Sequence, residues 1–109
     1  FYDYNAKYCD GGASKLCIPA DISEEMTAQI RRMAVKAYTA IDGEGFARVD
    51  FFIDRRTGKL YINEINTIPG FTKYSMFPLL WEAAGVKYGE TIERIIELGY
   101  ERYYAENSR

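Results

Sequence analysis

The 109-residue chain contains no histidine. Histidine is the commonest general base and the partner of serine or cysteine nucleophiles, so Ser-His and Cys-His schemes are excluded. Any chemistry must then rely on metal ions and electrostatics. We expect no signal peptide and no membrane span, because no apolar run approaches the ~20 residues of a transmembrane helix. The net charge of -2, without a basic run, gives no reason to expect nucleic acid. We therefore expect a cytoplasmic protein without a membrane or nucleic-acid partner.

Cysteine is also scarce, because only Cys9 and Cys17 are present. Their spacing matches neither a redox motif nor a zinc motif. We expect both to be reduced thiols in or near a loop. Hydrophobic residues make up 48% of the chain and aromatic residues 16%, which is enough to build the core of one small domain.

Two segments rich in aromatic and β-branched residues, Phe46–Asp54 and Lys59–Ile65, predict a β-hairpin. The residues between them end in Gly58, which suits a three-residue loop with glycine in the left-handed conformation. Pairing Arg55 with Lys59 then fixes the register, and side chains alternate between the two faces. One face is predicted to carry the pairs Phe52 with Ile62, Asp50 with Glu64, and Arg48 with Asn66. The other face is apolar except at Asn63, and it carries Ala47, Val49, Phe51, Ile53, Tyr61 and Ile65.

Asp50 and Glu64 place two carboxylates opposite each other, which is destabilising unless a cation lies between them. Asn66 adds a neutral oxygen beside them. Oxygen ligands of this kind suit Mg²⁺, which takes one or two carboxylates and completes its shell with water and phosphates. The structural alternative is a solvated hairpin face with alternating charges.

The residues that follow favour the metal site. Thr67–Tyr74 predicts an irregular loop, and Ser75 is the expected N-cap of a helix that begins at Met76. Backbone N–H groups in such a loop and at a helix N-terminus suit an oxyanion or a carboxylate. For Ser75 the structural alternative is a capping role alone.

The remaining chain predicts helices and one further strand. We expect a strand over Phe1–Tyr8 and a flexible loop over Cys9–Lys15. Leu16–Ala20 is expected to form an edge strand or the exit from that loop. The next helix is capped by Ser23 and ends at Asp42 and Gly43. Its apolar stripe, expected to pack on the apolar hairpin face, is Met26, Ile30, Met33, Ala34, Ala37, Tyr38 and Ile41. Two more helices are expected over Ser75–Ala84, in which Trp81 is a packing residue, and over Glu90–Tyr104.

Four phrases carry a family resemblance: YDYNAKY, GFARVDFF, YINEINTIPGFT and YSMFP. In this order and spacing they resemble the C-terminal half of the ATP-grasp domain of the D-alanine–D-alanine ligase family, from Phe1 to about Tyr100. The resemblance implies an α+β fold over residues 1–109, an antiparallel sheet with helices packed on one face. It also implies a fragment that lacks the family's N-terminal portion and is inactive alone. The open sheet edge predicts a homo-oligomer, a dimer.

The activity implied by the resemblance is ATP-dependent joining of two D-alanines through an acyl phosphate, for peptidoglycan precursor synthesis. Asp50 and Glu64 would hold one Mg²⁺, and Glu64 with Asn66 a second, with Mn²⁺ as a substitute. Arg48 and the backbone N–H of Gly70 would bind the developing negative charge. Ser75 and the backbone of Met76 would bind the carboxylate of the second D-alanine, and methionine at position 76 favours D-alanine over D-lactate or D-serine.

The resemblance also assigns the nucleotide contacts. Lys7 would reach the phosphates, Phe1 and Phe52 would lie near the adenine, and Tyr8 would hold a mobile loop closed over the site. On composition alone, Lys7 is an ordinary exposed lysine. Two other functions stay open at this point: another ATP-grasp carboxylate–amine ligase, and a non-catalytic half-domain that self-associates.

Overall fold

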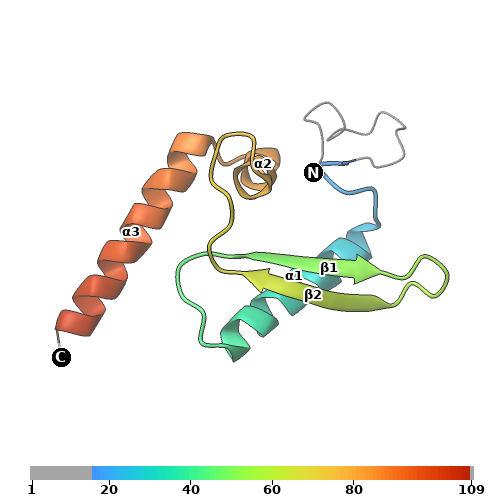
Figure 1. Cartoon of the computed structure of the whole chain (residues 1–109), viewed down its shortest axis with the longest axis horizontal. Helices are drawn as coiled ribbons and strands as arrows, with labels where there is room; N and C mark the ends of the chain where they lie inside the picture. The colour runs from blue at the N-terminus through green and yellow to red at the C-terminus, as the bar shows by residue number, and fades with distance from the viewer. Residues whose placement is uncertain (1–15, 109) are drawn as a thin grey trace.

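The computed structural model describes residues 16–108, which form an α+β arrangement. In chain order the elements are α1 (Glu24–Ala40), β1 (Arg48–Ile53), β2 (Leu60–Asn66), α2 (Met76–Ala83) and α3 (Tyr88–Asn107) (Figure 1). The two strands pair antiparallel, and α1 crosses behind them. The strand and loop expected over residues 1–15 lie outside the described residues, and Leu16–Ala20 forms no strand.

Helix α1 begins and ends where the sequence predicts. The Ser23 hydroxyl accepts a hydrogen bond from the Met26 N–H at 3.0 Å, so Ser23 is the N-cap. The helix is followed by Asp42 in the left-handed region, with φ 56°. The predicted stripe is half-buried except for Ile41, which is 55% exposed; its half-buried members are Met26, Ile30, Met33, Ala34, Ala37 and Tyr38.

The hairpin loop is one residue longer than predicted. The Asp54 N–H donates to the Lys59 carbonyl at 2.9 Å, so Asp54 pairs with Lys59, and the predicted Arg55–Lys59 pair is wrong. The physical reason is the Asp54 carboxylate, which accepts from the Arg56 N–H at 2.8 Å and closes an Asx-type turn. Gly58 takes the left-handed conformation as predicted, with φ 72°.

A β-bulge at Asn63 compensates for the longer loop. Phe51 pairs with Ile62, but the preceding residue of β1, Asp50, pairs with Glu64, two residues further along β2, so Asn63 is the extra residue. On the loop side Phe52 lies opposite Tyr61, so the predicted Phe52–Ile62 pair is wrong. Beyond the bulge the register is as predicted, with Asp50 opposite Glu64 and Arg48 opposite Asn66.

The bulge also changes which side chains share a face, because opposed residues of a pair point to the same side. Tyr61 joins the face of Phe52, contrary to the prediction, and Asn63 has no partner in the register of β1. The apolar face carries Val49, Phe51, Ile53, Leu60, Ile62 and Ile65. Val49 lines the same groove as Ala34 and Tyr38 of α1, so α1 covers this apolar face.

Five aromatic side chains, the aromatic cluster, join the hairpin to the C-terminal helices. They are Phe46, Phe71, Phe77, Trp81 and Tyr88. Phe77 is their centre: it is only 5% exposed, and its ring centroid lies 5.4 Å from that of Phe46 and 5.5 Å from that of Phe71. Trp81 packs edge-on against Phe77 at 6.4 Å, which agrees with its predicted packing role.

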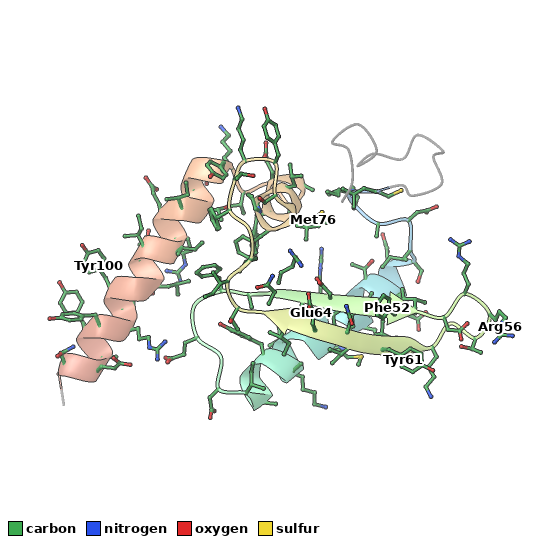
Figure 2. The ribbon with its side chains drawn as sticks, viewed as in Figure 1. Phe52, Arg56, Tyr61, Glu64, Met76 and Tyr100 are labelled. Carbon is green, nitrogen blue, oxygen red and sulfur yellow. The ribbon has the colours of Figure 1, made fainter. Side chains whose placement is uncertain are left out.

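Helix α3 stands away from the hairpin and makes the molecule elongated (Figure 1). The extents are 53 × 30 × 25 Å, and the radius of gyration is 15.9 Å, whereas a compact chain of this length has about 13 Å. Its outer face leaves Tyr100 60% exposed (Figure 2). Within residues 16–108, none of the helices combines the length and apolar character needed to cross a bilayer.

Cys17 is disulfide-bonded, so the prediction of a reduced thiol at this position is wrong. Motif spacing identifies metal and redox sites, but it does not predict a disulfide between cysteines that only the folded chain brings together. Cys9 lies outside the described residues.

Candidate functional site

The polar face of the hairpin, defined by Arg48, Asp50, Glu64 and Asn66, brings four predicted site residues together. Arg48 and Asp50 lie on β1, and their partners Asn66 and Glu64 lie opposite on β2. Neighbouring pairs on one face of an antiparallel ladder are close enough for their side chains to interact. The hairpin therefore places one cation, two carboxylates and one amide in a single patch.

Arg48 binds Asp50 through both arms of its guanidinium. The Arg48 Nε lies 2.9 Å from Asp50 Oδ1, and Nη2 lies 3.0 Å from Oδ2. Nη2 also lies 3.9 Å from Glu64 Oε1, so the guanidinium contacts both carboxylates. Its hydrogen bonds lower the pKa of Asp50 against the opposing effect of burial. Asp50 is therefore held ionised, as a metal ligand or a phosphate-positioning group must be.

Asn66 has a second role that turns the chain out of the sheet. Its Oδ1 accepts a hydrogen bond from the Ile68 N–H at 3.1 Å. An amide oxygen has two lone pairs, so one remains for a cation beside the carboxylates. Asn66 thus links the polar face directly to the loop that follows it.

The loop Thr67–Tyr74 is irregular, as predicted, and is anchored from both sides. Pro69 is buried, and Phe71 inserts its ring into the aromatic cluster. The Tyr88 hydroxyl at the start of α3 donates to the Phe71 carbonyl at 2.7 Å. These contacts fix the backbone on either side of Gly70, whose N–H is the predicted anion donor.

Ser75 occupies the N-cap position of α2, but its side chain does not cap the helix. Its Oγ instead accepts from the Thr72 N–H at 3.0 Å and lies 2.8 Å from Thr72 Oγ1. Gly70 packs against the same hydroxyl, because a Cβ built on Gly70 would lie 3.2 Å from Ser75 Oγ. The predicted capping bond is therefore absent at Ser75, whose hydroxyl belongs to the loop.

Phe52 and Met76 lie at the margins of the patch (Figure 2). Phe52 lies next to Asp50 on the same face and is 61% exposed. Met76 is half-buried at the first turn of α2. An exposed aromatic ring beside a charged patch offers a flat apolar surface to a ligand.

The ligand set of the polar face fits Mg²⁺. Residues 16–108 contain no group of three or more histidine, cysteine or acidic side chains arranged to hold a metal. Two carboxylates and an amide oxygen nevertheless match the few protein ligands that Mg²⁺ takes when phosphates and water supply the others. The Arg48 fork leaves this possible, because each carboxylate oxygen has a further lone pair.

Three predicted site residues, Phe1, Lys7 and Tyr8, lie outside the described residues. Two residues of the site were missed by sequence reasoning. Thr72 gave a signal, since it lies in the PGFT phrase, but nothing indicated that its side chain would contact Ser75. Tyr88 gave none, because its contact with Phe71 joins residues 17 positions apart.

Residues 1–97 match a protein-family model described as D-ala D-ala ligase C-terminus. The chain belongs to this ligase family. Among its relatives, the D-alanine–D-alanine ligase of Acetivibrio thermocellus is 58% identical over 103 residues, which are 94% of this chain and 27% of that protein. The predicted resemblance to the D-alanine–D-alanine ligases is thus confirmed.

Solved structures of the ligase family share the fold of this chain. The D-alanine–D-alanine ligase of Coxiella burnetii superimposes with a TM-score of 0.78 at 42% identity, over 82% of this chain and 25% of that one. The ligase of Bacillus anthracis complexed with ATP gives 0.71 at 30% identity, over 81% of this chain and 30% of that one. The chain therefore spans between a quarter and a third of these relatives.

Proposed function

We propose that this chain is the C-terminal portion of the ATP-grasp domain of an enzyme that joins two D-alanines at the expense of ATP, for peptidoglycan precursor synthesis. The observation that carries the proposal is that the polar face of the hairpin lies directly before the anchored loop Thr67–Tyr74, which is followed by Ser75. A phosphoryl-transfer site needs charge neutralisation and positioning more than covalent help. The names of the relatives favour this function over another carboxylate–amine ligase.

In the proposed reaction, the carboxylate of the first D-alanine attacks the γ-phosphate of ATP to give an acyl phosphate. The amine of the second D-alanine then displaces phosphate. Asp50 and Glu64 would hold one Mg²⁺, and Glu64 with Asn66 a second, with Mn²⁺ as a substitute. The bound metal would neutralise phosphate charge and orient the nucleotide.

Arg48 contributes a fixed cation to the same face. Its guanidinium is already oriented by Asp50, at 2.9 and 3.0 Å, so little reorganisation is needed when negative charge develops nearby. The backbone N–H of Gly70 is the second proposed donor for that charge. The contacts of Phe71 with Tyr88 and the aromatic cluster hold this part of the backbone in place.

Ser75 and the backbone of Met76 are proposed to bind the carboxylate of the second D-alanine, and Met76 to favour D-alanine as that substrate. Phe52 is proposed to lie near the adenine, which agrees with its exposed ring. Phe1, Lys7 and Tyr8 keep their proposed roles at the adenine, the phosphates and the closing loop.

The function is tested in a chimera in which this chain replaces the aligned 103-residue region of the Acetivibrio thermocellus ligase. We expect D-alanine-dependent phosphate release from ATP, with the dipeptide detected by NMR. Glu64→Gln should abolish nearly all of this activity, because it removes the carboxylate shared by both proposed metal sites.

The matched control is Glu97→Gln, a change of the same chemistry at an exposed position of α3, which should leave the rate within about twofold. A chimera that folds and binds ATP but forms no dipeptide would overturn the proposed function. A Glu64→Gln variant with most of its activity would remove the metal assignment alone.

We also propose that the native protein is a cytoplasmic homodimer. The dimer is proposed because the open edge of the hairpin favours pairing with another copy of the chain. Light scattering on the purified chain at micromolar concentration measures its mass. A monomer under these conditions would contradict the dimer.

A further inference from the structure

We propose that Thr72 is a positioning residue for the second substrate. It orients the Ser75 hydroxyl so that the proton of this hydroxyl points to the acceptor carboxylate. The inference rests on the proposed function, because it assumes that Ser75 binds the second D-alanine. It adds a residue to that subsite and states what its side chain does there.

The first observation is the geometry around the Ser75 hydroxyl. Its Oγ accepts from the Thr72 N–H at 3.0 Å and lies 2.8 Å from Thr72 Oγ1, where either oxygen can be the donor. A hydroxyl has one proton and two lone pairs. When Thr72 donates from both its backbone and its side chain, both lone pairs of Ser75 Oγ are filled. The proton of Ser75 is then left for a ligand.

A carboxylate ligand selects this arrangement, because it accepts hydrogen bonds and has none to donate. In the opposite arrangement Ser75 donates to Thr72 Oγ1, and the Ser75 proton is consumed within the loop. The Thr72 side chain therefore acts as a switchable partner. Its hydroxyl can accept a hydrogen bond from Ser75 when the site is empty and donate one to Ser75 when a carboxylate binds.

The second observation is a comparison within the chain itself. Ser23 and Ser75 both occupy N-cap positions with extended backbone, at φ -64° and -76° respectively. Ser23 Oγ accepts from the helix N–H of Met26 at 3.0 Å, whereas Ser75 makes no side-chain bond to its own helix. The Ser75 hydroxyl therefore bonds to Thr72 and does not cap α2. The first N–H groups of α2 receive no hydrogen bond from the N-cap side chain.

The third observation is the space beside the hydroxyl. Gly70 and Thr72 are exposed and Ser75 is half-buried, so a small ligand can approach Ser75 Oγ from solvent. A side chain at position 70 would fill part of this space, because its Cβ would lie 3.2 Å from Ser75 Oγ. The loop thus holds the hydroxyl from one side and leaves another side open.

The test uses the ligase chimera described above and compares Thr72→Val with Thr72→Ser. Valine removes the hydroxyl and keeps the shape of the side chain, whereas serine keeps the hydroxyl. We expect Thr72→Val to raise the KM for the second D-alanine by roughly three- to tenfold, the loss for one hydrogen bond. The KM for ATP should stay unchanged, and Thr72→Ser should restore the D-alanine KM to within about twofold. Thr67→Val, at an exposed threonine of the same loop, is the matched control.

A double-mutant cycle with Ser75→Ala separates orientation from general loop stability. If Thr72 acts through Ser75, then adding Thr72→Val to Ser75→Ala should change the KM for D-alanine by less than about twofold. Independent, multiplicative effects would overturn the proposal. So would an unchanged D-alanine KM in Thr72→Val, or a parallel rise in the KM values for ATP and D-alanine that serine does not rescue. A parent chimera without dipeptide formation would instead overturn the proposed function.

Discussion

Replacing Arg48 by methionine should expose the repulsion between the two carboxylates of the polar face. Arg48 lies 2.9 Å from one oxygen of Asp50 and 3.9 Å from Glu64, and these two acids face each other across the strands. Methionine fills a similar volume without the charge. The variant therefore keeps the hairpin but removes the cation that contacts both acids.

The size of the effect follows from Coulomb's law. Directly opposed residues of a ladder have Cβ atoms about 5 Å apart. Two unit charges at that distance repel by about 0.8 kcal/mol in water and about 3 kcal/mol at an effective dielectric constant of 20. The Glu64 side chain is 56% exposed and Asp50 30%, so the value should lie near the lower end. We expect Arg48→Met to lower the free energy of unfolding by about 1 to 2 kcal/mol at pH 7.

The pH dependence gives the sharper test. In the parent chain the hydrogen bonds of Arg48 lower the folded-state pKa of Asp50. This stabilisation is present above the unfolded-state pKa and is lost as the pH falls through the lower folded-state value. In Arg48→Met the largest cause of this lowering, the hydrogen bonds from Arg48, is gone. The stability difference between the two chains should be greatest near pH 7 and should shrink as the pH falls through the lowered folded-state pKa of Asp50.

The assay is urea denaturation of the 109-residue chain, followed by far-UV circular dichroism at pH 7 and at pH 3. Arg48→Lys keeps the charge but loses the two-armed contact, so it should lose about half as much as Arg48→Met. In the double variant Arg48→Met/Asp50→Asn the repulsion is absent, and most of the loss should disappear. An equal loss for Arg48→Met at both pH values would refute the electrostatic reasoning and point to packing alone.

Three further predictions concern the loops. Gly70→Ala places a Cβ 3.2 Å from Ser75 Oγ, so dipeptide formation by the chimera should fall at least about tenfold. Gly99→Ala, where nothing lies within 4 Å, should leave it unchanged. Gly58→Ala forces φ near +72° on a residue with a Cβ and should destabilise the chain by about 1 kcal/mol in the urea assay. Tyr88→Phe removes the bond to the Phe71 carbonyl and should cost about 1 kcal/mol there; an unchanged midpoint would contradict the anchoring role.

Local sequence signals predicted most elements, because caps and turns depend on neighbouring residues. Ser23 caps α1 as expected, and Gly58 turns the hairpin in the left-handed conformation. The element boundaries differ by at most three residues; the largest difference is at the C-terminus of α3, which extends to Asn107. The contacts that anchor the loop were not predicted, since Tyr88 meets Phe71 only after the chain has folded back through α2.

Ser75 shows a different limit of sequence reasoning. The residue type and position predicted a helix cap, and the backbone is indeed that of an N-cap. Two partners compete for its side chain, the N–H groups of α2 and Thr72 of the loop. The side chain bonds to Thr72. Propensity ranks residues for a position, but it does not decide between partners that tertiary structure brings within reach.

The residue pairs of the polar face were predicted correctly, although the loop length and the β-bulge were not. The longer loop and the bulge shift the register in opposite directions, so their effects on these pairs cancel. The Asp54 turn lengthens the loop by one residue, which would by itself place Asp50 opposite Asn63. Arg48 would then face the apolar Ile65, and Glu64 would face Val49, whereas register is strongly specified where one face is buried. The bulge at Asn63 absorbs the extra residue, so that Asp50 meets Glu64 while the apolar face still packs on α1. The irregular step in β2 is therefore what allows one hairpin to have both a core face and a site.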